Sequence, residues 1–487
     1  MSDEKAAASA GPVAPAPIAA DAAGGAGALP DYAAMGAAVR TDAERWPTLS
    51  PLGLDALTRW RQTPHAPIWV HECGDLLTAE DHEVLGRRRA ELLEPARAGR
   101  GGADRDGDDP PAWVEALVDR CRRHTTFFGR LGATSFDQLP MISRADLVRD
   151  VAAFVPRDQP LDRVVQGTSS GSSGAALVIP LDPVEISTEL LLLERLLADV
   201  GVDWPHDPDR VGLLSVVDQR QAFTYASVLT IRDDQRMARV NLDPAAWCVP
   251  GDRESFLAAA RPQVVTGSAL SLLALARLDV RLDPLALVSG AVDLTPAARV
   301  ELEQRWQTTV LDLWGLKETG PLAVSTDGGP HVVVPRRVHL EVVDGGGRAL
   351  PDGECGELVA TVDGNPLLPL LRYRTGDTGS LTWVGDRRAI VGLEGRAPVS
   401  FRAADGRLVP SVDLTQQLQH HGARSWSVHQ GRDGTVVARV LGGQPAVLRE
   451  ALCTLLGDAV CVETVPTPAD LGPGKPRRFS SALDGAG

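Results

Sequence analysis

Short β-rich runs alternate with helical stretches through the middle of the chain, and this alternation restricts the fold more than any other feature. The runs are rich in valine and leucine and occur at residues 210–217, 262–267, 285–292, 309–315, 336–344 and 355–362. Stretches with helical spacing, such as 183–202 and 295–306, separate several of them. Apolar runs between helices are typical of strands buried on both faces. The sequence therefore predicts an α/β architecture in which helices cover packed β-sheets.

The chain divides into four regions by composition. Residues 1–30 are an Ala/Pro/Gly tract without apolar periodicity, which predicts a disordered tail. Residues 31–111 contain helix-like segments followed by a Gly/Asp-rich stretch, which predicts a helical N-terminal extension and linker. We expect residues 112–395 to form a large N-terminal domain. Residues 396–487 have short strands and helices among many Gly and Pro, and we expect them to form a small α+β C-terminal lobe.

The charge balance and the apolar pattern exclude several classes of partner. The net charge of −15 argues against nucleic acid, whose phosphates require a basic stripe. No apolar run of about 18 residues is present, so no membrane partner is expected. The six cysteines lack spacing suited to zinc and are expected to be reduced thiols. An acidic start followed by several prolines differs from a secretory signal, which predicts a cytoplasmic location.

A loop rich in Ser and Gly is the sharpest local feature. It consists of Thr168, Ser169, Ser170, Gly171, Ser172, Ser173 and Gly174. Strand-like segments flank it, so we expect a hairpin whose backbone N–H groups and hydroxyls wrap a phosphate. The same letters also fit the G-x-S-x-G elbow of serine hydrolases, with Ser169 as the nucleophile. That elbow requires a helix directly after the serine, whereas a β-like segment follows here.

Four later residues place charge in loop-like settings. Glu318 follows a strand-like run, where a carboxylate can bind the metal of a nucleotide. Asp377 follows a Thr-Gly turn, where a carboxylate can accept hydrogen bonds from both ribose hydroxyls. Arg396 lies at the start of the C-terminal lobe, and Lys475 lies in a Gly/Pro loop typical of a mobile catalytic segment. Taken singly, Glu318 is better explained as a helix-end carboxylate, Asp377 as a turn residue and Lys475 as a solvated charge.

Together and in this order, these segments resemble the adenylate-forming superfamily, and most closely its phenylacetate–CoA ligase-like branch. That branch has S-S-G-T-T-G-K-P where this chain has residues 169–176, Y-G-L-[ST]-E where it has 314–318, and P-L-I-R-Y-R-T-G-D where it has 369–377. The S-G-[AG] segment of the branch matches Ser289, Gly290 and Ala291. The resemblance covers about residues 113–483 and leaves residues 1–110 largely outside.

The resemblance implies an AMP-forming ligase that activates a small carboxylic acid, aromatic or polar-substituted, with ATP and Mg²⁺. The acid attacks the α-phosphate to give an acyl-adenylate and pyrophosphate, and the acyl group then passes to a thiol such as CoA. Residues 168–174 would hold the β- and γ-phosphates, Glu318 would bind Mg²⁺, and Lys475 would bridge the acid and the α-phosphate. The C-terminal lobe would then rotate and withdraw Lys475. A homodimer is left open.

Further nucleotide contacts are implied by the same resemblance. Trp314 would stack on adenine where the family has Tyr, and Asp377 would bind the ribose hydroxyls. Arg396 would contact a phosphate or ribose oxygen. The other residues expected to contact the nucleotide are Ser289, Gly290, Ala291, Gly315, Lys317 and Thr319.

Three departures from the branch pattern affect these expectations. Ala175 and Ala176 replace Lys-Pro in the loop, while Lys317 stands where the branch has Ser or Thr. We hypothesise that Lys317 replaces the lost charge beside the phosphates, and a surface lysine is the alternative. Pro398 falls at the hinge position of the lobe and fixes its φ near about −65°. This restriction favours an alternative in which the acyl group passes to an amine, another nucleophile or a carrier protein.

The acid-binding part is the least defined by its sequence. Asp218, Gln219, Arg220, Phe223 and Tyr225 either line a polar acid pocket or form one face of a helix. Two further classes stay open at this point, a serine hydrolase and a nucleotide-binding protein without catalysis.

Overall fold

The computed structural model describes residues 40–98, 110–132, 135–170, 176–218, 222–395, 399–471 and 478–483. Its α-helices are α1 (Asp42–Arg45), α2 (Pro51–Arg61), α3 (Ala79–Ala98), α4 (Ala112–His124), α5 (Thr126–Gly129), α6 (Arg144–Asp150), α7 (Pro183–Asp199), α8 (Asp252–Ala260), α9 (Ala269–Ala276), α10 (Pro296–Trp306), α11 (Ser411–His420) and α12 (Pro445–Leu456). The strands of the first half are β1 (Val165–Ser170), β2 (Ala176–Leu181), β3 (Leu213–Val217), β4 (Tyr225–Leu229), β5 (Gln235–Asn241), β6 (Val264–Gly267), β7 (Ala286–Gly290), β8 (Thr309–Leu316), β9 (Gly320–Ser325) and β10 (His331–Val333). The remaining strands are β11 (Val338–Val343), β12 (Cys355–Val362), β13 (Leu370–Val384), β14 (Arg387–Glu394), β15 (Ser400–Arg402), β16 (Leu408–Pro410), β17 (Ala423–Gln430), β18 (Val436–Gly442), β19 (Val460–Thr464) and β20 (Phe479–Ser481).

Five parallel strands form the centre of the fold. They lie in the order β5-β3-β6-β7-β8, and β4 closes one edge by pairing antiparallel with β5. All five carboxyl ends lie at the same edge, which is where ligands bind in open α/β sheets. The predicted α/β fold class is confirmed, because the predicted runs at 210–217, 262–267, 285–292 and 309–315 overlap β3, β6, β7 and β8.

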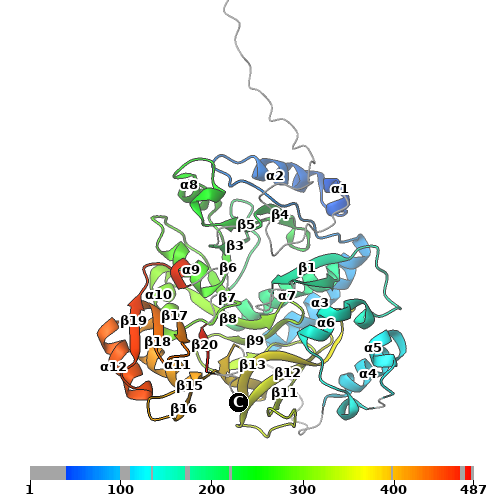
Figure 1. The fold of residues 1–487 in the computed structure, drawn as a ribbon. Coiled ribbons are helices and arrows are strands. Elements are labelled where there is room, and N and C mark those ends of the chain that lie inside the picture. Colours follow the sequence, from blue (N-terminus) through cyan, green and yellow to red (C-terminus); the bar gives the residue numbers. More distant parts are fainter. Residues whose placement is uncertain are drawn as a thin grey trace, which may run out of the picture.

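The sheet continues beyond β8 into antiparallel strands. Its order is β8-β9-β10-β14-β13-β12-β11, which makes a sheet of twelve strands within the described part of the chain. Figure 1 shows β11, β12 and β13 below the parallel strands. The long strand β13 pairs with β12 on one side and with β14 on the other. It thereby brings residues from a later part of the chain back toward β8.

Helices cover both faces of the parallel strands (Figure 1). On one face α2, α8, α9 and α10 pack around buried leucines such as Leu257 and Leu272, and on the other face α7 packs through Leu196. Three of these helices begin in the same way, and in α2 the cap is Ser50, followed by Pro51. Asp182 caps α7 and Thr295 caps α10, and a proline follows each cap at the first helical position. These signals explain why helices directly follow a strand or a turn here.

Residues 40–98 wrap around the β4 edge of the sheet. α2 packs against β4 and β5, and α3 packs against α7. Between these helices an extended segment runs beside β4. The amide of Ile68 donates to the carbonyl of Ala246 at 2.9 Å, and the amides of Val70 and His71 donate to the carbonyl of Thr224 at 3.1 Å each. This segment covers backbone groups that an edge strand would otherwise expose.

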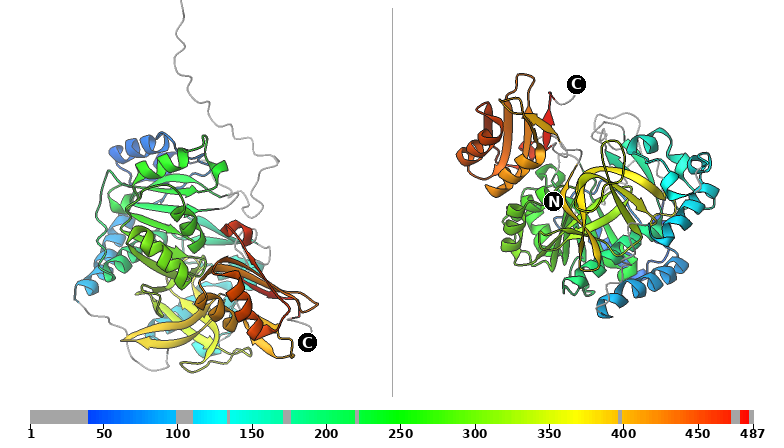
Figure 2. Two further views of the ribbon diagram at one scale, coloured as in Figure 1. Left: turned by 90° about the vertical axis from the view of Figure 1, so that its left-hand side faces the viewer. Right: turned by 90° about the horizontal axis from the view of Figure 1, so that it is seen from below.

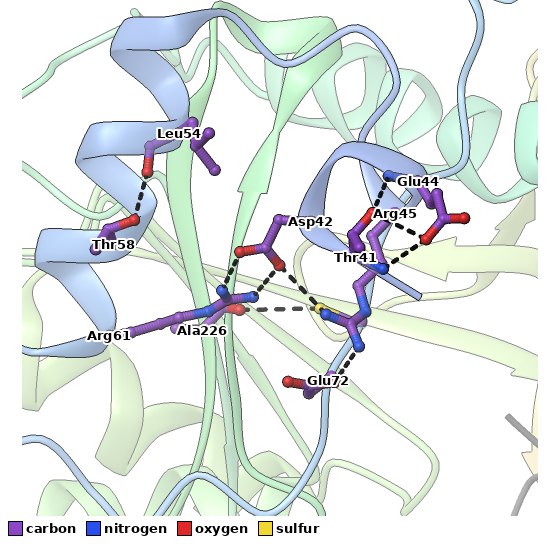
Figure 3. Close-up of polar contacts among 10 residues, drawn as sticks. Thr41, Asp42, Glu44, Arg45, Leu54, Thr58, Arg61, Glu72 and Ala226 are labelled. Carbon is purple, nitrogen blue, oxygen red and sulfur yellow. Dashed lines mark hydrogen bonds and ion pairs between the residues drawn. The ribbon is translucent and has the colours of Figure 1, made fainter. Parts of the chain in front are cut away.

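Ion pairs hold the start of the same region in place (Figure 3). Asp42 accepts two hydrogen bonds from Arg61, at 2.7 and 3.1 Å. Arg45 bonds to Asp42 at 3.3 Å and also forms an ion pair with Glu72. The carboxylate of Glu72 is therefore paired with Arg45.

The C-terminal lobe is a four-stranded sheet in the order β19-β18-β17-β20, with α11 and α12 packed on it. Figure 2 shows it as a separate body beside the α/β part. Leu441 and Leu471 of the lobe cluster with Leu270 of α9. Polar contacts add to this interface, because Thr295 donates to the carbonyl of Arg424 at 3.0 Å and Arg424 also pairs with Glu301. The described structure therefore has the lobe docked on α9 and α10.

Several predictions concern regions that the structure does not describe or does not test. The predicted tail at 1–30 and most of the Gly/Asp-rich stretch, residues 99–109, lie outside the described residues. The domain boundaries stay predictions. All six cysteines lie within the described ranges and are free thiols. Among the described helices, none combines the length and the apolar character that a membrane span needs.

Candidate active site

Two segments are joined at the carboxyl end of β8. The first contains Trp314 and Glu318, and the second, in β13, contains Tyr373 and Asp377. Trp314 Nε1 donates to Asp377 Oδ2 at 2.8 Å, and Tyr373 Oη donates to Glu318 Oε1 at 2.5 Å. Within each segment, the two residues that form these hydrogen bonds are four positions apart. The two motifs, which are about 60 residues apart in sequence, are therefore held together by a pair of hydrogen bonds.

The carboxylate of Glu318 is buried and oriented. Glu318 is 7% exposed, and Tyr373 is 1% exposed. Burial, and then the charge of Glu318, raises the pKa of the Tyr373 hydroxyl, so this group remains a donor at neutral pH. Because the bond engages Oε1, we expect a bound cation to use the second oxygen, Oε2.

Glu318 suits the way proteins bind nucleotide-associated Mg²⁺. No group of three or more His, Cys, Asp or Glu side chains that could hold a metal occurs among the described residues. Mg²⁺ does not need such a cage, because one or two carboxylates together with substrate phosphates and waters complete its octahedron. A single oriented carboxylate at a strand end is therefore a sufficient protein ligand.

Trp314 has a polar partner that its sequence position did not reveal. It is 8% exposed and packs among Leu322, Leu340 and other apolar side chains of the antiparallel strands. Its ring thus has little free surface, and its N–H is bonded to Asp377. The adenine-stacking role of Trp314 stays a prediction, and the structure adds a role in orienting the Asp377 carboxylate.

Gly315 and Thr319 shape the turn that carries Glu318. A Cβ at Gly315 would clash with the carbonyl oxygen of Gly320, so this position needs glycine. The Thr319 hydroxyl is buried; it accepts from the amide of Leu316 at 3.0 Å and donates to the carbonyl of Gly320 at 2.9 Å. Both residues therefore have structural roles, and nucleotide contact by either stays a prediction.

Lys317 lies beside the strand that leads into the Ser/Gly loop. Its side chain is exposed, and its Cε would be 3.1 Å from a Cβ at Gly167 of β1. Lys317 is also near Glu189 of α7. Burial raises the pKa of Glu189, and the charges of Arg336 and Lys317 oppose that rise. Lys317 therefore lies beside β1, and its role in phosphate binding stays a prediction.

Ser289, Gly290 and Ala291 form the end of β7 and the turn after it. Ser289 is 0% exposed, and within the described structure its hydroxyl has no hydrogen-bond partner. Ala291 has a φ of 64°, a left-handed conformation that is unfavourable for a residue with a Cβ. An unsatisfied buried hydroxyl and a strained turn are features that concentrate at functional sites.

The predicted hairpin around the Ser/Gly loop is present. β1 and β2 pair antiparallel, with Thr168 opposite Val178 and Ser169 opposite Leu177. The loop residues Gly171, Ser172, Ser173 and Gly174 lie outside the described residues. A serine hydrolase elbow requires a helix directly after its serine, whereas Ser169 lies within β1 and the next described element is the strand β2.

The predicted residues Arg396 and Lys475 also lie outside the described residues, as do Ala175 and Pro398. Arg478, three positions after Lys475, is described. Its guanidinium pairs with Asp293 at 2.7 Å and lies 4.1 Å from the centre of the Trp426 ring. Asp293 follows the Ser289–Ala291 turn closely in sequence. The C-terminal strand is therefore tied to this turn.

Sequence reasoning missed Tyr373 as a site residue. Its signal was its place in the R-Y-R-T-G-D run, four positions before Asp377. The two arginines of that run are engaged in structural ion pairs. Arg372 pairs with Glu341 at 2.9 and 3.1 Å, and Arg374 pairs with Glu357. These arginines brace β13 against β11 and β12.

Comparison with known proteins gives relatives for part of the chain and a fold for most of it. No protein-family model matches. Phenylacetate-coenzyme A ligase from Pseudomonas putida is 38% identical over 96 residues, which are 18% of this chain and 22% of that protein. The protein of the same name from Escherichia coli (strain K12) is 40% identical over 96 residues, with the same coverage. The matched stretch therefore spans only about a fifth of these relatives.

A crystal structure of 2-hydroxyisobutyryl-CoA ligase in the postadenylation state, in complex with 2-HIB-AMP, has a similar fold. It matches with a TM-score of 0.56 and 15% identity over 76% of this chain and 88% of that chain. At this identity the match establishes the fold alone. The resemblance to the adenylate-forming superfamily and its phenylacetate–CoA ligase-like branch is confirmed by the curated relatives, and the fold class is confirmed by this structure.

Proposed function

We propose that the protein is an AMP-forming carboxylic acid ligase that activates a small acid with ATP and transfers it to a thiol. The observation that carries the proposal is the pair of hydrogen bonds joining Trp314 to Asp377 and Tyr373 to Glu318. One carboxylate suits a ribose and the other suits a nucleotide metal, and both are fixed at the carboxyl end of β8. The names of the partial relatives, phenylacetate-coenzyme A ligases, support the same chemistry.

In the first step the acid carboxylate attacks the α-phosphate of ATP, and pyrophosphate leaves. Residues 168–174 would hold the β- and γ-phosphates, and Asp377 the ribose. Glu318 would hold Mg²⁺, which spreads the negative charge of the leaving pyrophosphate when bound. Lys475 would bridge the acid and the α-phosphate and stabilise charge as it develops. Arg396 would contact a phosphate or ribose oxygen.

In the second step the thiol sulfur attacks the acyl carbonyl, the bond to AMP breaks, and a thioester and AMP leave. Pro398 at the hinge position favours a variant of this step in which an amine, another nucleophile or a carrier protein accepts the acyl group. The two variants share the acyl-adenylate and differ in the acceptor.

Acid-dependent pyrophosphate release across a panel of carboxylic acids, with and without CoA, tests the proposal. Products of the CoA-containing reactions are identified by mass, and a thioester is expected. ATP binding without pyrophosphate release for any acid would instead indicate a nucleotide-binding protein. Ester hydrolysis without ATP, with fluorophosphonate labelling of Ser169, would indicate a hydrolase.

Lys317→Thr is expected to weaken ATP binding by roughly threefold to fivefold. The lysine lies beside β1 and is exposed, and exposed ion pairs contribute at most about 1 kcal/mol. Calorimetric titration with ATP and with AMP measures the effect. AMP affinity should stay the same, because AMP lacks the β- and γ-phosphates. An unchanged ATP affinity would make Lys317 a surface lysine.

Trp314→Phe is expected to raise the KM for ATP by about tenfold and to change kcat less. An aromatic ring is kept, although a smaller one, and the indole donor to Asp377 is lost. A hydrogen bond to a charged group contributes about 1.5–3 kcal/mol. The specific readout is the preference for ATP over 2′-deoxy-ATP, which should shrink when Asp377 is no longer oriented. An unaltered preference in Trp314→Phe would show that the indole does not position the ribose-binding carboxylate.

A further inference from the structure

A row of four polar side chains crosses the parallel sheet near its carboxyl edge. It consists of Tyr225 on β4, Arg239 on β5, Ser215 on β3 and Thr266 on β6. Register pairs Tyr225 with Arg239, Arg239 with Ser215, and Ser215 with Thr266. Residues paired in register project to the same face of a sheet, and neighbouring strands are about 4.8 Å apart. The four side chains therefore form a continuous polar row on one face.

This row replaces an apolar layer at the end of the strands. Two residues earlier on the same face, Leu213 and Val264 are buried in a core cluster and Met237 packs against it. On this face the side chains therefore change from apolar to polar within two residues along β3, β5 and β6. None of the four row residues is fully buried or fully exposed. Ligands of open α/β sheets bind outside this end of the strands.

Arg239 is the charged member of the row and lacks a partner. Its Nε is buried, and in the described residues neither this atom nor the rest of the guanidinium has a hydrogen bond or an ion pair. Other buried arginines differ in this respect. Arg232 pairs with Glu194, and Arg299 donates to backbone carbonyls of Val310, Thr326 and Ser325. A half-buried guanidinium without an anion is destabilising, which suggests that a ligand supplies the anion.

The surroundings leave this charge uncompensated. His71, from the extended segment beside β4, has its ring centre 5.9 Å from that of Tyr225. Burial lowers the pKa of His71 and raises that of Tyr225 to about 12, so both are neutral donors or acceptors at pH 7. Burial likewise raises the pKa of Cys73 to about 11. Glu72 is held by Arg45 (Figure 3).

Asp218 follows β3 and is partly buried. The charges that act on it are those of Asp243, Arg253 and Arg277, and Arg239 is not among them. In the described residues the row therefore carries one positive charge and several neutral hydrogen-bonding groups.

We propose that this row binds the distal end of the substrate acid, and that the acid carries a second carboxylate there, which pairs with Arg239. The inference rests on the proposed ligase function. β5 lies three strands from β7, so about 14 Å separates the backbone of Arg239 from that of the Ser289 strand. A substituted aryl or chain diacid, together with the reach of the arginine side chain, spans that distance. His71 extends the row, so the N-terminal segment contributes to acid recognition.

Matched pairs of acids test this inference. Pyrophosphate release is measured with phenylacetate and 4-carboxyphenylacetate, and with hexanoate and adipate, for the wild type and Arg239→Met. The wild type should prefer each diacid, and Arg239→Met should lower that preference at least 100-fold by removing the charge while keeping an unbranched side chain. Arg236→Met is the control, since Arg236 lies on the same strand but projects to the opposite face, where it contacts Trp60. This control should keep the wild-type preference.

A second measurement separates this inference from the proposed function. Binding of each acid to the protein without ATP is followed by calorimetry. If no acid supports pyrophosphate release but the diacid binds the wild type and not Arg239→Met, the ligase function fails and the diacid site stands. If monoacids are activated while diacids are rejected, or if Arg239→Met keeps the wild-type preference, the inference is overturned and the ligase function stands.

Discussion

Lys475→Ala is expected to lower acid-dependent pyrophosphate release by roughly 10²–10³-fold, the usual effect of removing one group that stabilises transition-state charge. The chain contains three lysines among 49 basic Lys and Arg residues, and one of them stands in the C-terminal Gly/Pro loop. A compact ammonium can lie between a carboxylate and a phosphate, where the planar fork of arginine fits less well. Single-turnover pyrophosphate release with saturating acid and ATP measures the step itself.

Lys475→Arg is the informative companion variant, because it keeps the charge and changes only its shape. It should recover no more than a small part of the lost rate if the geometry of the ammonium matters. ATP affinity should change little in both variants, since the lysine acts on charge that develops during the reaction. Release within tenfold of the wild-type rate in Lys475→Ala would contradict the assigned role.

Four of the five parallel strands were predictable because their signals are local. Each of β3, β6, β7 and β8 is a short apolar run bounded by Gly, Pro or polar residues, and such a run needs no distant partner to be recognised. The helices α7 and α10 carry a capping residue followed by proline, which marks their first turn directly. The hairpin of β1 and β2 follows from a Gly-rich loop between two β-like runs.

The extended segment beside β4 was not predictable in the same way. His71 bonds to Thr224 across more than 150 residues of sequence, and its own segment has neither a strand-like nor a helix-like pattern. For the stretch around Phe223 and Tyr225, the sequence allows both a pocket lining and a helix face. The structure places Tyr225 in strand β4, while Gln219 and Arg220 lie outside the described residues. Pairing with β5 and cover by the N-terminal segment decide this conformation.

The candidate site was predictable as a set of motifs but not as a set of contacts. Glu318 and Asp377 were identified by resemblance, whereas Tyr373 was missed and Trp314 was given only a stacking role. Their hydrogen bonds join segments about 55 to 63 residues apart, so no local pattern encodes them. For Arg239 the informative feature is a missing partner, which only a three-dimensional structure can reveal.

Glu318→Gln is expected to lower pyrophosphate release by roughly 10²–10³-fold, equivalent to about 3–4 kcal/mol of lost transition-state stabilisation. The amide keeps the size of the side chain and still accepts from Tyr373, so the fold around β8 and β13 should persist. What is lost is the negative charge at a buried strand end that would hold Mg²⁺. A titration of the rate with Mg²⁺ measures this directly, and the midpoint should move to higher Mg²⁺ concentration.

Tyr373→Phe separates the charge of Glu318 from its orientation. It removes the hydroxyl that donates to Oε1 and leaves the carboxylate in place, so a loss of about 10- to 100-fold in metal affinity is expected, as for other residues that orient a ligand.

Glu303→Gln serves as a matched control for Glu318→Gln, because Glu303 lies on α10 in an ion pair with Arg299. A wild-type Mg²⁺ midpoint in Glu318→Gln would exclude this carboxylate as the metal ligand. An equal loss in Glu303→Gln would attribute the effect to net charge, because neither orientation nor a metal contact is altered at that position.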